Sequence, residues 1–168
     1  GSLTARRNRD WIRMDFPVDP VETVEPPGAL LKSLDDVTPD AIRRSERDYL
    51  VHLPDPDVVR ALQPNLSALA TLSDVRGVIV TAAAQASDID FVSRFFAPRV
   101  GVPEDPVTGS SHCALGPYWA AQTGDTSLTG RQVSDRGGTV RVHLDTPDAE
   151  RITLAGRATT VLRGRLDG

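Results

Sequence analysis

The chain has 168 residues, of which 39% are hydrophobic and 25% are charged. These values are typical of a globular domain and exclude a disordered tail or a fibrous repeat. The net charge of −4 argues against a protein whose main task is to bind nucleic acid. A single cysteine, Cys113, excludes an internal disulfide and a multi-cysteine zinc site. Three scattered histidines suggest no metal centre, and we therefore expect neither a metal nor a nucleic-acid partner.

Long apolar segments are missing from the sequence. No stretch approaches the roughly 18 to 20 apolar residues that a membrane helix requires. The N-terminal sequence GSLTARR has no apolar core of the kind found in signal peptides. We therefore expect a cytoplasmic protein without a membrane partner.

The first predicted elements are two strands, at Leu3–Arg7 and Trp11–Phe16, around a polar turn. Residues 17–27 contain four prolines, which break any regular element and predict an extended connector. This connector is the predicted domain boundary, and it separates residues 1–24 from residues 25–168.

Short helices and buried strands follow the connector. The segment Gly77–Ala83 is dense enough in valine and isoleucine to lie inside a sheet. Asp55, with Pro56 behind it, and Asn65 are typical helix-capping residues. The other predicted elements here are a helix at Gly28–Leu34 and strands at Arg47–Leu53 and Asp88–Phe96.

The C-terminal half begins with a predicted helix at Ser110–Gln122, which we expect to be interrupted at Gly116-Pro117. The tail, Ser127–Arg163, contains four strand patterns. They are separated by turn residues at 135–138, at 145–148 and at Ala155-Gly156. The order of elements predicts a mixed α and β domain with a β-rich C-terminal meander.

A loop between the strand ending at Phe96 and the helix beginning near Ser110 carries the candidate site. It is rich in glycine, proline and carboxylates, and it delivers Thr108 and Gly109 to the helix start. Free backbone N–H groups at a helix start, with glycine allowing close approach, suit a carboxylate or a phosphate. Asp105, flanked by prolines, is a candidate for a rigidly aimed acid, base or hydrogen-bond acceptor.

The same residues also have purely structural interpretations. Thr108 and Ser110 are ordinary helix caps, and Asp105 suits a turn or an ion pair with Arg99. Arg136 is a candidate ligand for a substrate carboxylate, although the following Gly137-Gly138 also suits a tight hairpin turn.

The neighbouring side chains of the predicted helix receive structural interpretations. We expect Cys113 to be a buried structural thiol, and Tyr118 and Trp119 to belong to the core. His112 and Cys113 point about 100° apart on a helix, so they are poorly placed to form a thiol–imidazole pair. For His112 a capping or site-lining role is the functional alternative to a structural one.

At this loop the sequence resembles a known family. The segment DFVSRFFAPRVGVPEDPVTGSSHCALGPYWA (Asp90–Ala120) is similar to the signature of the PhzF family of phenazine-biosynthesis-like isomerases and epimerases. The later QVSDRGG and the closing segment Ala158–Gly164 also fit the C-terminal end of that family, and DWIRMDFP (Asp10–Pro17) resembles a hairpin late in its first domain.

The resemblance implies an α+β, diaminopimelate-epimerase-like fold, in which a mixed, mostly antiparallel sheet curls around a central helix. Family members have two such domains with the active site between them, use no cofactor or metal, and in the phenazine branch isomerise a dihydro-hydroxyanthranilate by proton transfer. Asp105 matches the aspartate of the family's EDP-x-TGS run, and Gly109 and Ser110 match its substrate-holding residues. The central helix would then begin near Ser110.

The resemblance also implies that part of the family's active site is missing here. Most of the first domain, with the family's catalytic glutamate and a glycine–histidine pair, has no counterpart, so residues 1–24 would be a remnant hairpin and connector of that domain. We expect a PhzF-like isomerase acting on a small carboxylate, completed by a first-domain chain or by a second copy in a homodimer. The alternatives are a carboxylate-binding protein without catalysis and an assembly protein. Because the hairpin has no sheet partners in this interpretation, its edges should pair with another chain.

Overall fold

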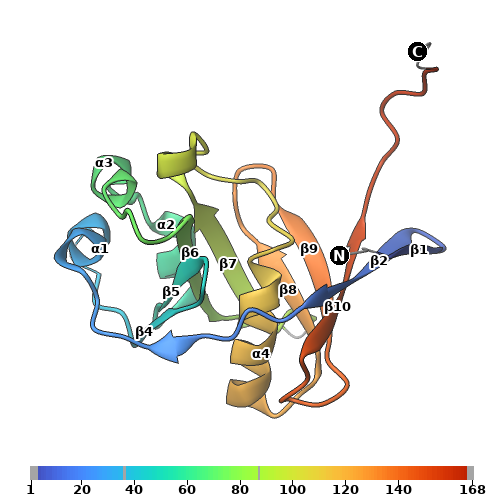
Figure 1. The fold of residues 1–168 in the computed structure, drawn as a ribbon, viewed down its shortest axis with the longest axis horizontal. Coiled ribbons are helices and arrows are strands. Elements are labelled where there is room, and N and C mark those ends of the chain that lie inside the picture. The colour runs from blue at the N-terminus through green and yellow to red at the C-terminus, as the bar shows by residue number, and fades with distance from the viewer. Residues whose placement is uncertain (1–3, 36, 87, 166–168) are drawn as a thin grey trace.

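The computed structural model describes residues 4–35, 37–86 and 88–165. They form one ten-stranded sheet with four α-helices and one 3₁₀ turn (Figure 1). The strand order is β1-β2-β10-β9-β8-β7-β6-β5-β4-β3, and only the β5–β6 and β7–β8 pairs are parallel. The predicted mixed, mostly antiparallel sheet is therefore confirmed.

The strands are β1 (Ala5–Asn8), β2 (Trp11–Pro17), β3 (Glu22–Thr23), β4 (Ala41–Arg44), β5 (Asp48–His52), β6 (Gly77–Ala83), β7 (Phe91–Phe96), β8 (Ser127–Gln132), β9 (Gly138–His143) and β10 (Arg151–Arg157). The helices are α1 (Gly28–Ser33), α2 (Pro56–Ala61), α3 (Leu66–Ala70) and α4 (His112–Thr123), and a 3₁₀ turn covers Pro98–Val100. Asp55 and Asn65 cap α2 and α3 as predicted, each accepting a bond from a backbone N–H of the first turn. The short strands β3 and β4 were not predicted.

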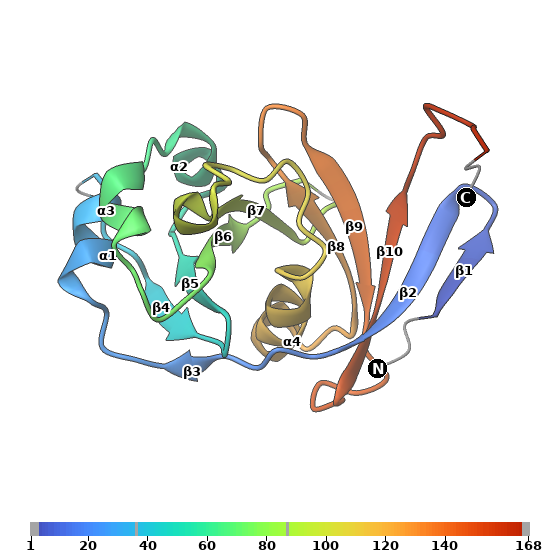
Figure 2. The same cartoon turned by 45° about the horizontal axis from the view of Figure 1, so that its top comes forward.

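Helix α4 packs against one face of the sheet (Figure 2). Its buried side chains, among them Leu115 and Trp119, form a core with inward residues of β5 to β10. The opposite face of β5, β6 and β7 packs against α1, α2 and α3, with Val51, Val78 and Val80 at the contact. Strands β8, β9 and β10 contribute to the α4 core alone, so no helix covers their outer face in the part of the chain described.

Helix α4 runs through Gly116-Pro117 without a break, so the predicted interruption is wrong. Proline lacks the N–H that would bond to the carbonyl of Cys113 four residues earlier. The backbone N–H of Asp19, in the connector after β2, donates to that carbonyl instead, at 3.0 Å. The connector therefore supplies the hydrogen bond that Pro117 cannot make.

The N-terminal hairpin is not without sheet partners, which corrects a second expectation. Strand β2 pairs with β10 along its whole length, from Trp11 opposite Arg157 to Pro17 opposite Arg151. The predicted strand at Leu3–Arg7 is β1, although Leu3 itself lies outside the described residues. The assignment of residues 1–24 to a remnant of another domain stays a prediction.

The tail contains three strands and not four. Strand β10 continues through Ala155-Gly156 because these residues pair with Arg13 and Ile12 of β2. Strand β10 ends at Arg157, which pairs with Trp11. Trp11 is the first residue of β2, so β2 has no further residue with which β10 could pair. Residues 158–165 form no strand, and Val161 and Leu162 are 92% and 84% exposed.

Gly116 allows the close contact between α4 and the sheet. A Cβ atom at this position would lie 2.3 Å from Ile152 Cδ1 and 2.9 Å from Val142 Cγ1. We expect Gly116→Ala to lower the free energy of unfolding by about 2 kcal/mol, because overpacking forces the core to shift. Chemical denaturation measures this change.

Gly28→Ala is the matched control, since Gly28 is also helical and a Cβ atom there would have no neighbour within 4 Å. This control should be neutral or slightly stabilising. Equal stability of the two variants would contradict the packing argument.

Candidate functional site

The candidate site lies at the start of α4, where the loop after β7 turns into the helix. Gln132, fully buried at the end of β8, holds this loop. Its side-chain Nε2 donates to the carbonyl oxygen of Asp105 at 2.6 Å, and its Oε1 accepts from the backbone N–H of Thr108 at 2.8 Å. One amide side chain therefore fixes both ends of the segment that carries Asp105.

The orientation of the Asp105 carboxylate is also fixed. The hydroxyl of Thr108 donates to its Oδ2 at 2.5 Å, and the backbone N–H of Asp105 donates to the carbonyl of Phe95. The carboxylate is half-buried. Within the described residues its Oδ1 receives no hydrogen bond, so this oxygen is available to a ligand.

Glu104, the preceding carboxylate, has a structural role. It forms two hydrogen bonds with the buried guanidinium of Arg94, at 2.8 and 2.9 Å. Arg94 in turn donates to the backbone carbonyls of Val59 and Leu62. Because Glu104 is held in this ion pair, Asp105 is the carboxylate of this loop that can act as an acid or a base.

The turn before α4 presents free hydrogen-bond donors. In the part of the chain that the structure describes, none of the backbone N–H groups of Gly109, Ser110 and Ser111 donates a hydrogen bond. The Ser111 side chain is turned back to the carbonyl of Thr108, at 2.8 Å. A Cβ atom built on Gly109 would meet nothing within 4 Å, so a ligand can approach the backbone there. Together with the partial positive charge of a helix start, these N–H groups favour an anion.

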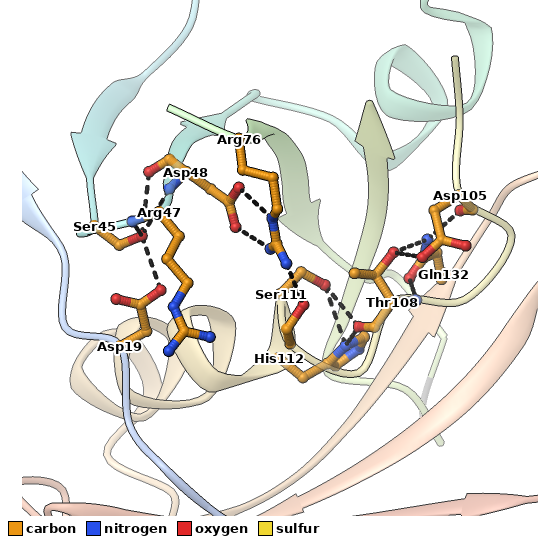
Figure 3. A network of polar contacts seen from close by, with 11 residues as sticks. Asp19, Ser45, Arg47, Asp48, Arg76, Asp105, Thr108, Ser111, His112 and Gln132 are labelled. Atoms are coloured by element: carbon orange, nitrogen blue, oxygen red, sulfur yellow. Dashed lines mark hydrogen bonds and ion pairs between the residues drawn. The ribbon is translucent and has the colours of Figure 1, made fainter. Parts of the chain in front are cut away.

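Arg76, which directly precedes β6, adds a guanidinium hydrogen-bond donor to this turn (Figure 3). Its Nη1 donates to Ser110 Oγ at 2.9 Å. Its Nε and Nη2 donate to the two oxygens of Asp48, whose side chain is only 1% exposed. Burial raises the pKa of Asp48, and Arg76 partly offsets this effect. The ion pair holds the guanidinium in place and offsets its charge, while Nη1 remains at Ser110 as a fixed donor beside the helix start.

His112 is a structural residue of the helix start. Its Nδ1 lies 2.8 Å from the carbonyl oxygen of Thr108. A carbonyl can only accept, so Nδ1 carries the proton of the neutral ring. Nε2 is buried without a partner among the described residues, and burial lowers the pKa of His112 to about 4. The contact is not a helix cap, because a capping side chain accepts from a backbone N–H, and α4 has no side-chain cap hydrogen bond.

Comparisons with known proteins identify the family. A sequence model of the phenazine biosynthesis-like proteins (PhzC-PhzF) matches residues 7–164. The chain belongs to the PhzF family. The resemblance seen in the EDPVTGS segment, Glu104–Ser110, is thereby confirmed.

Similar proteins occur in bacteria and animals. The chain is 43% identical over 166 residues to an uncharacterized isomerase of Pseudomonas aeruginosa and 40% identical over 167 residues to one of Halalkalibacterium halodurans. It is 39% identical over 181 residues to phenazine biosynthesis-like domain-containing protein 2 of the mouse. These matches cover 99% of this chain and 61%, 61% and 62% of the three relatives. The chain therefore spans about three fifths of the length of the curated relatives that it matches.

Solved structures of the family share the fold. A PhzF-family protein of Enterococcus faecalis superimposes with a TM-score of 0.86 at 31% identity, over 95% of this chain and 59% of that one. A PhzC/PhzF protein of Clostridium difficile gives a TM-score of 0.83 at 32% identity, over 98% and 61%.

In this PhzF-family chain, the four loop residues proposed from the sequence come together at the start of α4. Asp105 and Thr108 are joined by a hydrogen bond, and Gly109 and Ser110 form the turn that follows. Their functional roles stay predictions. Arg136 is exposed in the β8–β9 turn and makes no hydrogen bond or ion pair within the described residues, so its role also stays a prediction.

Three structural interpretations are settled by the contacts. Arg99 donates to the carbonyl of Val75 at 3.4 Å and does not pair with Asp105. Cys113 is buried as expected, and burial raises the pKa of its thiol to about 11. Tyr118 and Trp119 lie in the core, as predicted.

Sequence reasoning missed Arg76, Asp48 and Gln132. A usable signal for the first two was their place at the starts of two predicted buried strands, where an isolated charge needs a partner. In β5 and β6, Asp48 stands opposite Gly77, the residue after Arg76. Gln132 is the first residue of the QVSDRGG segment, but its role could not be inferred from the sequence, because its three side-chain hydrogen bonds span 24 to 27 residues.

Among the described residues, no group of three or more histidine, cysteine, aspartate or glutamate side chains is arranged to hold a metal ion. None of the helices in these residues has the length and apolar character that crossing a membrane requires.

The low pKa of His112 predicts a pH-dependent stability. Its pKa is about 4 in the folded chain and near 6.5 when unfolded, so the unfolded state binds more protons between these values. The free energy of unfolding should therefore fall by about 3 kcal/mol as the pH drops from 6.5 to 4. Urea denaturation at pH 7, 6 and 5 measures this decrease in the free energy of unfolding.

His112→Gln should remove most of this dependence, and the half-buried His52, whose pKa is also lowered by burial, accounts for a remainder of the same sign. The control His143→Gln changes an exposed side chain and should keep the wild-type profile. If the free energy of unfolding of His112→Gln depended on pH as in the wild type, His112 would not be the source of the dependence.

Proposed function

We propose that this chain forms one side of the active site of a PhzF-like isomerase. The reaction is the transfer of a proton within a small carboxylate-bearing metabolite. It needs no cofactor, because the migrating group is a proton and no electron is exchanged with a redox partner. The site lies at the start of α4, with Asp105 as the catalytic residue and the turn at Gly109 and Ser110 as the substrate-binding element.

The observation that carries this proposal is the pairing of an anion site with an oriented carboxylate. The free N–H groups of Gly109 and Ser110 and the guanidinium of Arg76 favour a negatively charged group of the substrate. Asp105 is joined to the same turn through the Thr108 hydroxyl, and its Oδ1 is free among the described contacts. A substrate bound by its carboxylate would therefore lie within reach of a fixed proton acceptor.

The proposed step is an acid–base exchange. A C–H bond of the substrate breaks, its proton passes to a carboxylate, and its electron pair enters the conjugated system of the substrate. A proton then returns to a different carbon atom. Asp105 accepts or relays one of these protons, while the N–H groups and Arg76 stabilise the negative charge that develops on the substrate.

A second proton donor must come from elsewhere. Glu104 is held by Arg94, so the loop offers Asp105 alone as its base. The chain also spans only about three fifths of its curated relatives. We therefore propose that the site is completed by a first-domain polypeptide or by a second copy of this chain.

A carboxylate-binding protein without catalysis is the second candidate. The anion site alone supports it, because binding needs Arg76 and the free N–H groups but no second acid. Arg136, at the exposed β8–β9 turn, could contribute to either function as a further carboxylate ligand.

The test is reconstitution. This chain is mixed with a polypeptide corresponding to the part of the Pseudomonas aeruginosa relative that lies outside the match. The probe is the dihydro-hydroxyanthranilate used by the phenazine branch, in D₂O, with deuterium incorporation followed by NMR. Incorporation by the mixture and by neither part alone supports completion by a first-domain polypeptide, and incorporation by this chain alone supports completion by a second copy. Binding of the probe without incorporation supports the second candidate and overturns the first.

Asp105→Asn should reduce deuterium incorporation at least 100-fold, since the amide cannot accept the proton at neutral pH. The dissociation constant of the probe should change less than about threefold, because the anion site is intact. Asp135→Asn is the control, as Asp135 is an exposed carboxylate of the β8–β9 turn. Unchanged incorporation by Asp105→Asn would contradict the catalytic role of Asp105.

Gly109→Val should abolish carboxylate binding without unfolding the protein. A side chain at this position projects into open space, so it meets no protein atom but occupies the path of the ligand. Calorimetric titration with anthranilate should give at least a tenfold weaker affinity than in the wild type, at a melting temperature within about 3 °C. Equal affinity would place the carboxylate elsewhere.

A further inference from the structure

A second candidate site lies on the outer face of the sheet, on the side away from α4. Residues of strands β2, β10, β9 and β8 line it, together with Asn8, Arg9 and Asp10 of the β1–β2 hairpin. The hollow has a volume of about 890 Å³. Its size lies within the range of pockets that bind small molecules. It shares no lining residue with the site at the start of α4.

The floor of the hollow follows from the strand register. Ala155 of β10 stands opposite Arg13 of β2 on one side and Arg141 of β9 on the other. Neighbouring strands lie about 4.8 Å apart, so the Cα atoms of these two arginines are separated by about 10 Å. Ala155, the residue between them, has a small side chain and lines the hollow.

Trp11 holds two guanidinium groups beside this floor. The Cζ of Arg141 lies 4.1 Å from the centre of its ring, and the Cζ of Arg157 lies 4.9 Å from it. Both contacts are cation–π interactions, which orient the planar groups against the indole. Two like charges are thereby kept close together.

The positive charge of the hollow is not balanced. Four arginines line it, and Asp10 is the one carboxylate in the lining. Within the described residues, Arg13, Arg141 and Arg157 form no ion pair, whereas the nearby Arg151 pairs with Asp15 outside the hollow. An anion placed among these three arginines would relieve their mutual repulsion and accept several charged hydrogen bonds.

We propose that this hollow binds a metabolite-sized anion carrying two or more phosphate or carboxylate groups. Three guanidinium groups without an ion pair among the described residues, two of them held on Trp11, suit more than one anionic group. The volume and the bounding hairpin favour a small molecule. The net charge of −4 on the whole chain disfavours a long polyanion such as nucleic acid.

Trp11 provides a direct readout, because the second tryptophan, Trp119, is buried in the α4 core. Inorganic pyrophosphate and citrate are titrated separately at constant ionic strength, and the tryptophan fluorescence is recorded. The proposal predicts a saturable change with a dissociation constant below about 1 mM for at least one of them. Tighter binding of pyrophosphate assigns phosphate groups to the ligand, and tighter binding of citrate assigns carboxylates.

Two variants test the site in different ways. Arg141→Gln removes one guanidinium, and Ala155→Leu fills the floor while it leaves every charge in place. Each substitution should lower the affinity for the more tightly bound probe at least tenfold. Circular dichroism checks that each variant is folded. Arg151→Gln is the matched control, since this arginine lies on the same face but pairs with Asp15; it should bind like the wild type.

The proposal is overturned if neither probe gives a saturable change. It is also overturned if Arg141→Gln and Ala155→Leu, both folded, bind the probes as tightly as Arg151→Gln does.

Discussion

A buried ion pair between Asp48 and Arg76 sets the electrostatics at the start of α4. A carboxylate with 1% exposure is costly unless it is paired, so Asp48 keeps two of the three guanidinium nitrogens. The third nitrogen reaches Ser110. The guanidinium is therefore fixed beside the free N–H groups before any ligand arrives, and such preorganised donors are what electrostatic stabilisation of a reacting anion requires. Exchanging Arg76 for lysine would keep the charge but lose this three-way geometry.

Two contacts between distant parts of the chain complete the arrangement. Gln132 at the end of β8 holds Asp105 and Thr108, and the backbone of Asp19 replaces the donor that Pro117 lacks. The N-terminal connector is thus part of the environment of α4, and β2 is part of the same sheet through β10. Removing residues 1–24 would expose the Cys113 carbonyl and one edge of β10 together.

The sequence was sufficient to predict features that depend on near neighbours. The helix caps at Asp55 and Asn65, the buried strand at Gly77–Ala83 and the loop that delivers Asp105 to a helix start all follow from local patterns. The wrong predictions concern residues whose hydrogen-bonding or pairing partners lie far away in the sequence. Pro117 predicted a break because its substitute donor lies 98 residues earlier, and Ala155-Gly156 predicted a turn because β2 was not known to pair with β10. Arg76 and Asp48 were missed for the same reason, since their roles depend on a contact between residues 28 apart.

The two proposed sites lie on opposite faces of the sheet and depend on different arginines, Arg76 at the start of α4 and Arg13, Arg141 and Arg157 outside. The central claim concerns the first of them, which needs a group that this chain does not supply from its own loop. Native mass spectrometry of the protein isolated from its own cells tests that claim most directly. The account predicts an assembly heavier than one copy, holding either a second polypeptide or a second copy of the chain. A single copy at micromolar concentration, with no associated polypeptide, would contradict it.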